Sequence, residues 1–301
     1  MFMKKRLTAF LIFSVLLISI TSAGLIDSLK GIITGEATSQ PTNVSINVVG
    51  TTQVTVSVDN STLAGGVNPV ESSSVNTVIY VKVCDADGVN DINDSATDIV
   101  YLGPNSETRN GNCSWTNDID SNCANFTCSA DLWYFDTPGA WIINASGNDL
   151  GNKTPVYNSS SNFTFNQLKA LVISPTQLNW SSLTPGSTNV GADNDPSVVN
   201  NTGNYNGTID ITAYDLYGKT TTTEVFASNN FTADVNDPAC SGNSLPNATL
   251  TTITGSVSNP GNLSAGGGAG QEQIYYCIPL VPSVSSQEYT TDQSGSWIIS
   301  Y

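Results

Sequence analysis

The chain has 301 residues, of which 39% are hydrophobic and only 11% are charged, so Ser, Thr, Asn and Gly supply much of its polarity. Its length corresponds to about two domains of roughly 150 residues each. The net charge of −16 argues against nucleic-acid binding, which depends on Lys and Arg at the phosphates. The sequence contains no His, which excludes Ser-His-Asp and Cys-His catalysis and His-ligated metals.

The N-terminal residues predict export from the cell. A basic stretch at residues 4–6 precedes an apolar run over 7–20 and three small residues at 21–23. This order is typical of a cleaved signal peptide, which we expect to cover residues 1–23. The alternative is an uncleaved anchor, since the run approaches the length of a membrane-spanning helix. Residues 24–40 then form a linker or a short amphipathic segment, and the rest of the chain is expected outside the cell.

Beyond residue 40 the hydrophobic residues alternate with polar ones, which is typical of half-buried antiparallel strands. Turns rich in Gly, Pro and Asn separate the runs, and the pattern restarts after residue 166. We therefore predict an all-β protein of two tandem antiparallel β-sandwiches, over 41–166 and 167–301. The predicted strands cover residues 44–48, 54–58, 75–84, 97–102, 126–128, 132–135, 141–145, 162–165, 170–174, 207–216, 249–257, 273–280 and 297–301.

Six cysteines in an exported chain predict disulfides, and these are Cys84, Cys113, Cys123, Cys128, Cys240 and Cys277. Pairing within each proposed sandwich joins Cys240 to Cys277 and leaves three choices for the other four. Of these we favour Cys84–Cys123 with Cys113–Cys128. A zinc site would need Cys pairs two to four residues apart, and Cys123 and Cys128 are spaced more widely.

The sequence carries fifteen Asn-x-Ser/Thr acceptors for N-glycosylation, about twice the number expected by chance from its composition. In several of them the middle residue is hydrophobic, as in the three Asn-Phe-Thr acceptors. On a strand this residue points inward, so that Asn and Thr point to solvent. We predict glycans at Asn43, Asn60, Asn93, Asn112, Asn125, Asn144, Asn152, Asn158, Asn162, Asn179, Asn200, Asn206, Asn230, Asn247 and Asn262.

An acidic loop at residues 85–94 follows a predicted strand and suggests a Ca²⁺ site. Carboxylate oxygens are the ligands that this hard cation takes, and the expected ligands are Asp85, Asp87, Asp91 and Asp94. The alternative is a turn whose Asp and Asn side chains bond their own backbone. Asp193 and Asp195 form a weaker second candidate.

No catalytic residues are predicted, and the expectation is a protein that is not an enzyme. A carboxylate pair could hydrolyse glycosides without His, but nothing in the sequence marks one carboxyl group as buried. Five aromatic residues could instead stack on sugars, although Trp133 and Trp141 lie on predicted strands and are expected in the core. These five are Trp115, Trp133, Tyr134, Trp141 and Trp180.

Residues 132–141, which read LWYFDTPGAW, and the DLGN at 149–152 are similar to the end of an Ig-like module, and the DADG at 85–88 resembles its turn. The LTPG at 183–186 and the NTGN at 201–204 look like a second module. Together these stretches resemble uncharacterised secreted Ig-like surface proteins of small-genome archaea. The resemblance implies Ig-like sandwiches at the cell surface and no catalytic residues.

From these features we expect an exported, N-glycosylated protein with a structural or adhesive role. Its partners would be other envelope proteins or further copies of itself, and no metal other than Ca²⁺ is expected. The alternatives are a glycan-binding surface module and, less favoured, a secreted hydrolase.

Overall fold

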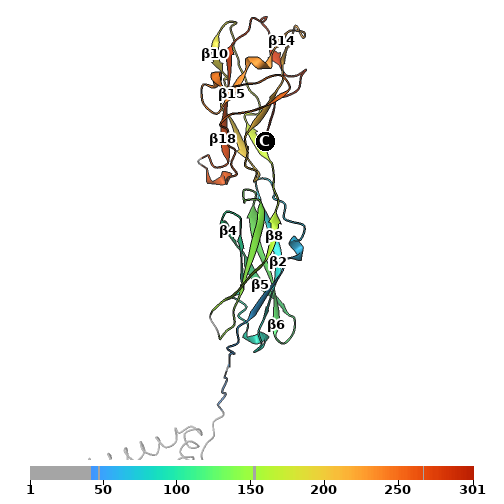
Figure 1. The fold of residues 1–301 in the computed structure, drawn as a ribbon, viewed down its shortest axis with the longest axis vertical. Coiled ribbons are helices and arrows are strands. Elements are labelled where there is room, and N and C mark those ends of the chain that lie inside the picture. The colour runs from blue at the N-terminus through green and yellow to red at the C-terminus, as the bar shows by residue number, and fades with distance from the viewer. Residues whose placement is uncertain (1–41, 47, 152–153, 267) are drawn as a thin grey trace, which may run out of the picture. The chain divides into compact units, whose positions relative to one another are not determined.

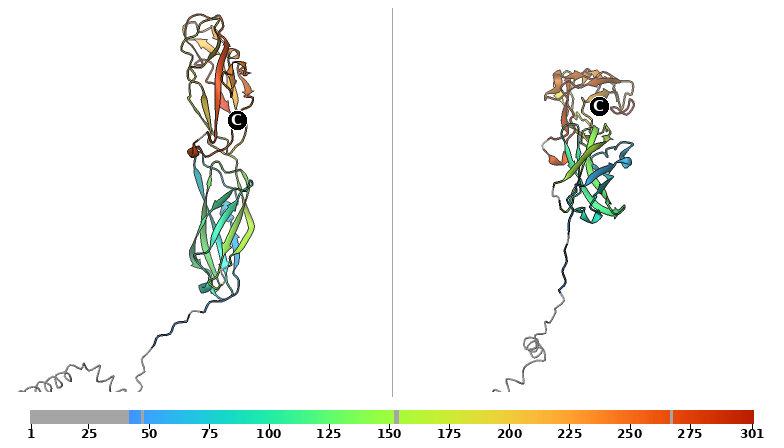
Figure 2. Two further views of the ribbon diagram at one scale, coloured as in Figure 1. Left: turned by 90° about the vertical axis from the view of Figure 1, so that its left-hand side faces the viewer. Right: turned by 60° about the horizontal axis from the view of Figure 1, so that its bottom comes forward.

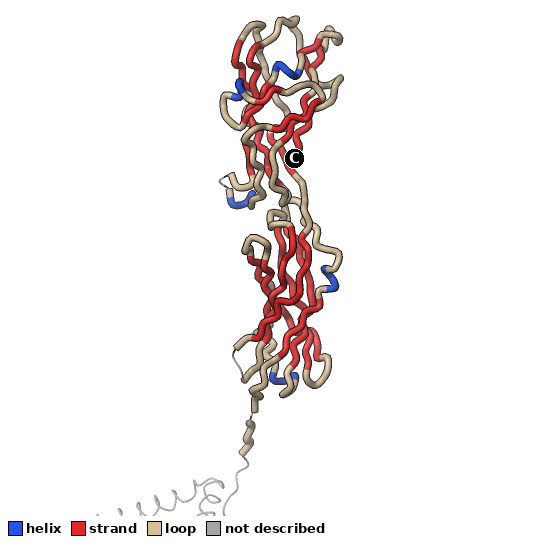
Figure 3. Tube along the Cα trace, viewed as in Figure 1, coloured by secondary structure: helices blue, strands red, loops and turns tan. Residues whose placement is uncertain are grey.

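The computed structural model describes residues 42–46, 48–151, 154–266 and 268–301, and Val49–Tyr301 form one compact unit. Strands and the turns between them dominate this unit, and the helices described are single 3₁₀ turns (Figure 1 and Figure 3). The paired strands are antiparallel, as in the long β2–β6 pair. The protein is therefore all-β, with several antiparallel sheets.

The N-terminal part of this unit contains two four-stranded sheets, with strand orders β1-β2-β6-β5 and β4-β3-β7-β8. The 3₁₀ turns here are η1 (Ser61–Leu63) and η2 (Val89–Asp91). The strands are β1 (Thr55–Asp59), β2 (Ser74–Cys84), β3 (Asp98–Leu102), β4 (Thr108–Asn110), β5 (Asn112–Asp118), β6 (Cys123–Trp133), β7 (Gly139–Gly147) and β8 (Val156–Phe165).

The C-terminal part contains a sheet built around β18, in the order β16-β15-β18-β11-β9 with β10 also on β18, and two three-stranded sheets, β17-β12-β20 and β14-β13-β19. Its 3₁₀ turns are η3 (Ser228–Asn230), η4 (Ala239–Ser241) and η5 (Leu263–Ala265). The strands are β9 (Leu171–Ser174), β10 (Thr188–Gly191), β11 (Ser197–Asn201), β12 (Asp210–Ala213), β13 (Leu216–Gly218), β14 (Val225–Phe226), β15 (Thr232–Asp234), β16 (Asn243–Ser244), β17 (Thr249–Thr252), β18 (Gln271–Leu280), β19 (Tyr289–Thr290) and β20 (Ile298–Ser300). Figure 2 shows this part from two further directions; apart from β18, its strands are two to five residues long.

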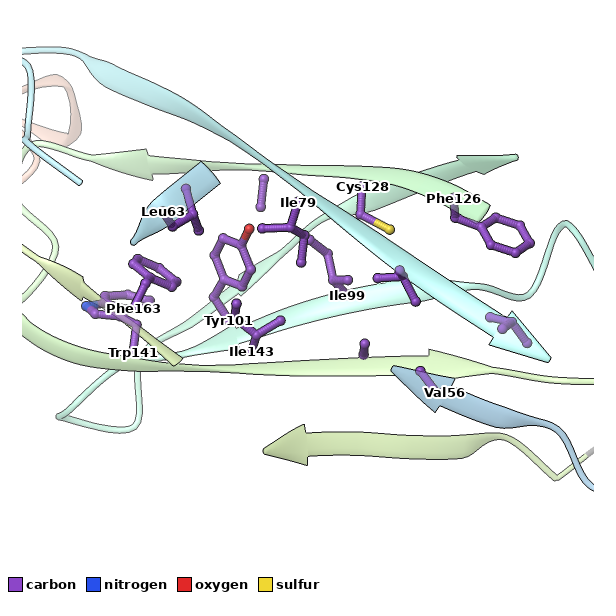
Figure 4. Close-up of a cluster of buried hydrophobic side chains, with 14 of the residues drawn as sticks. Val56, Leu63, Ile79, Ile99, Tyr101, Phe126, Cys128, Trp141, Ile143 and Phe163 are labelled. Atoms are coloured by element: carbon purple, nitrogen blue, oxygen red, sulfur yellow. The ribbon is translucent and has the colours of Figure 1, made fainter. Parts of the chain in front are cut away.

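Alternation along the strands builds the first hydrophobic cluster. On β2 the buried side chains are Ile79, Val81 and Val83, while the residues between them face outward. The other sheet contributes Tyr101 and Trp141, which are also fully buried (Figure 4). Because the cluster takes side chains from both four-stranded sheets, the two sheets form its two walls. Each large side chain buried in this way stabilises the fold by about 1.5–3 kcal/mol.

A second hydrophobic cluster fills the C-terminal part. Its buried members include Ile274 and Ile278 of β18, Ile211 of β12 and Phe231 after η3. It is separate from the first cluster, which agrees with the restart of the sequence pattern, although the boundary at 166/167 stays a prediction.

Three predicted strands have to be redrawn. Residues 126–128 and 132–133 belong to one strand, β6, because Ala130 continues the inward-facing alternation between them, and residues 134–135 lie in the turn that follows. The strand predicted at 207–216 is broken into β12 and β13, since Asp215 turns away to accept the backbone N–H of Ser228 at 2.8 Å.

The predicted signal peptide at 1–23 and the predicted segment at 24–40 lie outside the described residues, and so does the acceptor Asn152. Residues 42–46 and 48 are described, and none of them belongs to a strand, contrary to the strand predicted at 44–48. In the part of the chain that the structure covers, no helix has the length and apolar character needed to cross a membrane.

Candidate metal centre

The acidic loop begins where β2 ends at Cys84. Its backbone is fixed against residues 121–122, because Asp85 N–H donates to Asn122 O and Val89 N–H donates to Ser121 O, both at 2.8 Å. Gly88 has a φ of 123°, a conformation that favours glycine, and it turns the chain into η2. The loop is therefore held as a rigid hairpin-like turn at the end of the sheet.

Three carboxylates of this loop come together. One oxygen each of Asp85, Asp87 and Asp91 lies within 4.8 Å of the other two. Asp85 is 1% exposed and Asp91 is 7% exposed, whereas Asp87 lies on the surface. Hard oxygen ligands at such separations are suited to a divalent cation such as Ca²⁺.

A segment from the start of the compact unit binds the same carboxylates. Gly50 N–H donates to Asp91 Oδ2 at 2.6 Å, and the N–H groups of Thr51 and Thr52 donate to Asp87 Oδ2 at 3.1 and 2.9 Å. A Cβ atom on Gly50 would lie 2.1 Å from Asp87 Oδ2, so only glycine allows this approach. The carboxylates thus hold residues 50–52 through backbone groups.

A second loop, after β7, adjoins the acidic loop. Asp149 forms an isolated bridge with Ile92, and Leu150 N–H donates to Asp91 O at 2.7 Å. Asp149 is 2% exposed and brings a fourth carboxylate near Asp85. Sequence reasoning missed this neighbour, since only the pairing of the two loops brings residue 149 to residue 92.

The environments of the carboxylates shift their pKa values in opposite directions. Burial raises the pKa of Asp85, and the nearby charges of Asp91, Asp87 and Asp149 raise it further. Hydrogen bonds from Thr52, and to a smaller extent from Thr51, lower the pKa of the exposed Asp87. The cluster therefore holds one carboxyl group that is poorly stabilised as an anion beside another that is well stabilised.

Asp94 does not belong to the group. It is exposed and follows Asn93, whose N–H donates to Asn148 O at 2.8 Å, so of the four expected ligands only Asp85, Asp87 and Asp91 come together. The second candidate also has another use: Asp195 accepts the N–H groups of Ala192 and Tyr276, and Asp193 accepts that of Ser181. These backbone contacts hold the loop at 192–195 against β18 and against residue 181.

The structure contains the three disulfides that the sequence analysis favours, Cys84–Cys123, Cys113–Cys128 and Cys240–Cys277. The first two join residues directly opposite each other on neighbouring strands, β2 with β6 and β5 with β6. Cys84–Cys123 lies next to the acidic loop and fixes its first residue. Three disulfides indicate an oxidising environment of the kind found outside the cell.

The described glycosylation acceptors are all at least partly accessible, and seven are exposed: Asn43, Asn112, Asn162, Asn179, Asn206, Asn247 and Asn262. The inward orientation of the middle residue holds for Phe126, Phe163 and Phe231, which are 0–4% exposed. At the last of these acceptors the strand argument fails, because Asn230 ends η3 and Thr232 is buried.

One aromatic prediction is confirmed and another is wrong. Trp141 is fully buried in the first cluster, but Trp133 is 42% exposed. Leu132 is the inward residue at this end of β6, so its neighbour Trp133 faces outward, where it stacks on Phe135 with ring centroids 6.0 Å apart.

Comparison with known proteins finds no match among family models, curated proteins or solved structures. The description of the chain as an all-β, disulfide-bonded protein therefore rests on its own geometry.

Proposed function

We propose that this is an exported, N-glycosylated protein of the cell surface, built from two Ig-like β-sandwiches, with a structural or adhesive role. Two antiparallel sheets around one hydrophobic cluster support the sandwich, and the disulfides and accessible acceptors support the location. We propose no catalytic role, because the chain has no His and the acidic groups at 85–91 and 193–195 bind backbone N–H groups of neighbouring loops.

The observation that carries the adhesive role is an exposed apolar stripe near the N-terminus. Val44, Ile46 and Val48 are 77%, 79% and 85% exposed, and they alternate with polar residues. Such a segment has the pattern of a strand that pairs with another sheet, and adding a strand to a sheet edge is a common mode of assembly. The next alternating run, at 54–58, is already used in the fold: Val54 is buried just before β1, and Val56 is buried within it.

A suitable edge is β5, the last strand of its sheet. Six of its seven residues are exposed, and Trp115 is 49% exposed. The opposite edge strand, β1, is in contact with β8, since Asn158 Nδ2 donates to Val56 O at 2.7 Å. We therefore propose that residues 44–48 of one copy pair with β5 of another.

The test replaces the stripe with Ser at positions 44, 46 and 48 and compares the secreted protein with wild type by sedimentation velocity. The expected result is an oligomer for wild type and a monomer for the triple variant. A matched control replaces three other exposed apolar residues, Val172, Leu250 and Val257, which are 49–61% exposed. This control should still assemble.

Two outcomes would contradict the proposal. A wild-type protein that stays monomeric at tens of micromolar and washes freely from cells would remove the basis for assembly. Equal losses in both triple variants would show that general surface hydrophobicity, and not the stripe, drives association.

A second function is favoured by the exposed Trp133. Its ring stacks on Phe135, and Arg109 lies 5.9 Å from the centre of the Phe135 ring, so an aromatic surface with a cation beside it faces solvent. Such a surface suits binding of a glycan by stacking. A clear hit on a glycan array that is lost in Trp133→Ala would favour this function over assembly.

A further inference from the structure

The acidic loop holds a buried oxygen that the protein itself leaves unsatisfied. Asp85 is 1% exposed, and its Oδ1 accepts the N–H of Asp87 at 2.8 Å. Its Oδ2 is buried and has no hydrogen-bond partner among the described residues. A buried polar atom without a partner is costly and rare in folded proteins, so this oxygen calls for a ligand.

We propose that Asp85, Asp87 and Asp91 bind one Ca²⁺ ion, and that the bound ion fixes residues 50–52 to the sheets. Ca²⁺ takes oxygen ligands at 2.3–2.6 Å, so two oxygens on one ion lie up to about 5 Å apart, whereas Mg²⁺ allows only about 4 Å. One oxygen each of the three Asp side chains lies within 4.8 Å of the other two, inside the range that Ca²⁺ spans. The site offers no nitrogen or sulfur ligand, which disfavours zinc.

The hydrogen bonds around the group leave room for this ion. Each carboxylate uses one oxygen for backbone N–H groups: Oδ1 of Asp85, Oδ2 of Asp87 and Oδ2 of Asp91. The second oxygen of each carboxylate has no such bond among the described residues. The backbone donors thus orient all three side chains and leave one oxygen of each for the cation.

A further buried oxygen lies on the neighbouring loop. Asn148 is 8% exposed, and its Oδ1 also has no partner within the described chain, next to Asp149. Among the described residues, neither Asp85 nor Asp87 nor Asp91 forms an ion pair with Lys or Arg, and the charge of Asp149 lies close by. A divalent cation would compensate this charge.

The ion would also stabilise the attachment of residues 50–52. The N–H groups of residues 50–52 donate to the carboxylates of Asp87 and Asp91. These hydrogen bonds form only while both carboxylates keep their positions. By cancelling the repulsion between Asp85, Asp87 and Asp91, the ion would keep them there. The site therefore lies where the N-terminal segment leaves the sheets and would set the rigidity of that junction.

The test measures Ca²⁺ binding to the full secreted protein by calorimetry, together with its melting temperature in CaCl₂ and MgCl₂. We expect one ion with a Kd of about 10⁻⁴–10⁻³ M, the range of extracellular modules. At ten times the Kd the melting temperature should rise by about 3–6 °C. Mg²⁺ should bind at least tenfold more weakly.

Three variants make the result specific. Asp87→Asn changes an exposed ligand, so it should fold and lose binding, and Asp85→Asn should lose it as well. Asp94→Asn is the matched control, since it removes the same charge from the same loop outside the group. The proposal is overturned if wild type binds no Ca²⁺ at 10 mM, if Mg²⁺ binds equally well, or if Asp87→Asn and Asp94→Asn respond to Ca²⁺ alike, which would mean charge screening only.

Discussion

The ion pair between Arg109 and Asp136 is the place where a single substitution should do most damage. Asp136 has no exposed side-chain surface, and Arg109 reaches it with two nitrogens, Nη2 and Nε, the latter at 3.0 Å. The third donor is Trp133 N–H at 2.8 Å, so this carboxylate also closes the turn after β6. In Arg109→Met the carboxylate keeps its burial and loses two of three donors.

The expected cost of Arg109→Met is about 3–5 kcal/mol of unfolding free energy, the usual penalty for an unpaired buried charge. That is a large share of the roughly 5–15 kcal/mol that a domain has. Lys219→Met is the control, because its 3.0 Å pair with Glu288 is exposed and an exposed ion pair contributes little to stability. The double variant Arg109→Met/Asp136→Leu should be more stable than Arg109→Met, since only Trp133 N–H is then left without its acceptor.

The pH dependence gives a second readout. Burial raises the pKa of Asp136 even in wild type, although Arg109 lowers it, and removing Arg109 raises it further. A pKa above the unfolded value means that stability is lost as pH rises through the folded pKa. Arg109→Met should therefore lose less stability at pH 5 than at pH 7. Urea denaturation followed by Trp fluorescence measures both, and the reasoning fails if Arg109→Met costs no more than Lys219→Met at either pH.

Two other predictions concern the C-terminal part. Replacing Cys240 and Cys277 with Ser opens a loop of 37 residues and should cost about 4 kcal/mol on the chain-entropy model, with peptide mapping of the unreduced wild type showing this pair. Hydrogen bonds from Ser285 lower the pKa of Glu224, so its contribution is present above about pH 4.3 and is lost as pH falls through the lowered pKa. The difference in unfolding free energy between wild type and Glu224→Gln should accordingly be constant above pH 5 and shrink toward pH 3; a difference independent of pH would contradict this.

The strands that the sequence predicts well are those with one fully buried face. Residues 75–84 were predicted and β2 covers Ser74–Cys84, because Ile79, Val81 and Val83 mark the inward face without interruption. The strand β5 was missed, since it lies at a sheet edge with nearly every side chain exposed and therefore has no apolar alternation. It pairs with β6 through backbone hydrogen bonds, which form with almost any side chain and therefore cannot be predicted from the residue types.

The candidate metal centre also combines features that the sequence predicts with features that it does not. Asp85, Asp87 and Asp91 could be found because they are close in sequence and η2 folds them together. The sequence could not predict that Asp94 lies outside the group or that Asp149 lies close to it. Both features depend on how the loop after β7 bridges to Ile92. The contacts of residues 50–52 with these carboxylates could not be predicted either. They depend on the route that the chain takes before β1, and hydrophobic periodicity does not predict that route.

Gly50 offers a final test of how the N-terminal segment is held. A Cβ at this position would meet Asp87 Oδ2 at 2.1 Å, so Gly50→Ala must displace residues 50–52 from their carboxylates. Proteolysis follows the population of the open form, and losing about 1.4 kcal/mol of local stability raises that population tenfold. We therefore expect cleavage near residues 49–53 at least tenfold faster in Gly50→Ala than in wild type.

The matched control is Gly65→Ala, since a Cβ at that glycine would meet no atom within 4 Å. It should be cleaved like wild type. Added Ca²⁺ should protect wild type and Gly65→Ala further, because the ion stabilises the carboxylates to which residues 50–52 bind. Equal cleavage of both variants would mean that these hydrogen bonds do not hold the segment. In that case the acidic loop would still be the proposed Ca²⁺ site, but the bound ion would not fix residues 50–52 to the sheets. The acidic loop would then not anchor the chain that leads to the exposed stripe at 44–48.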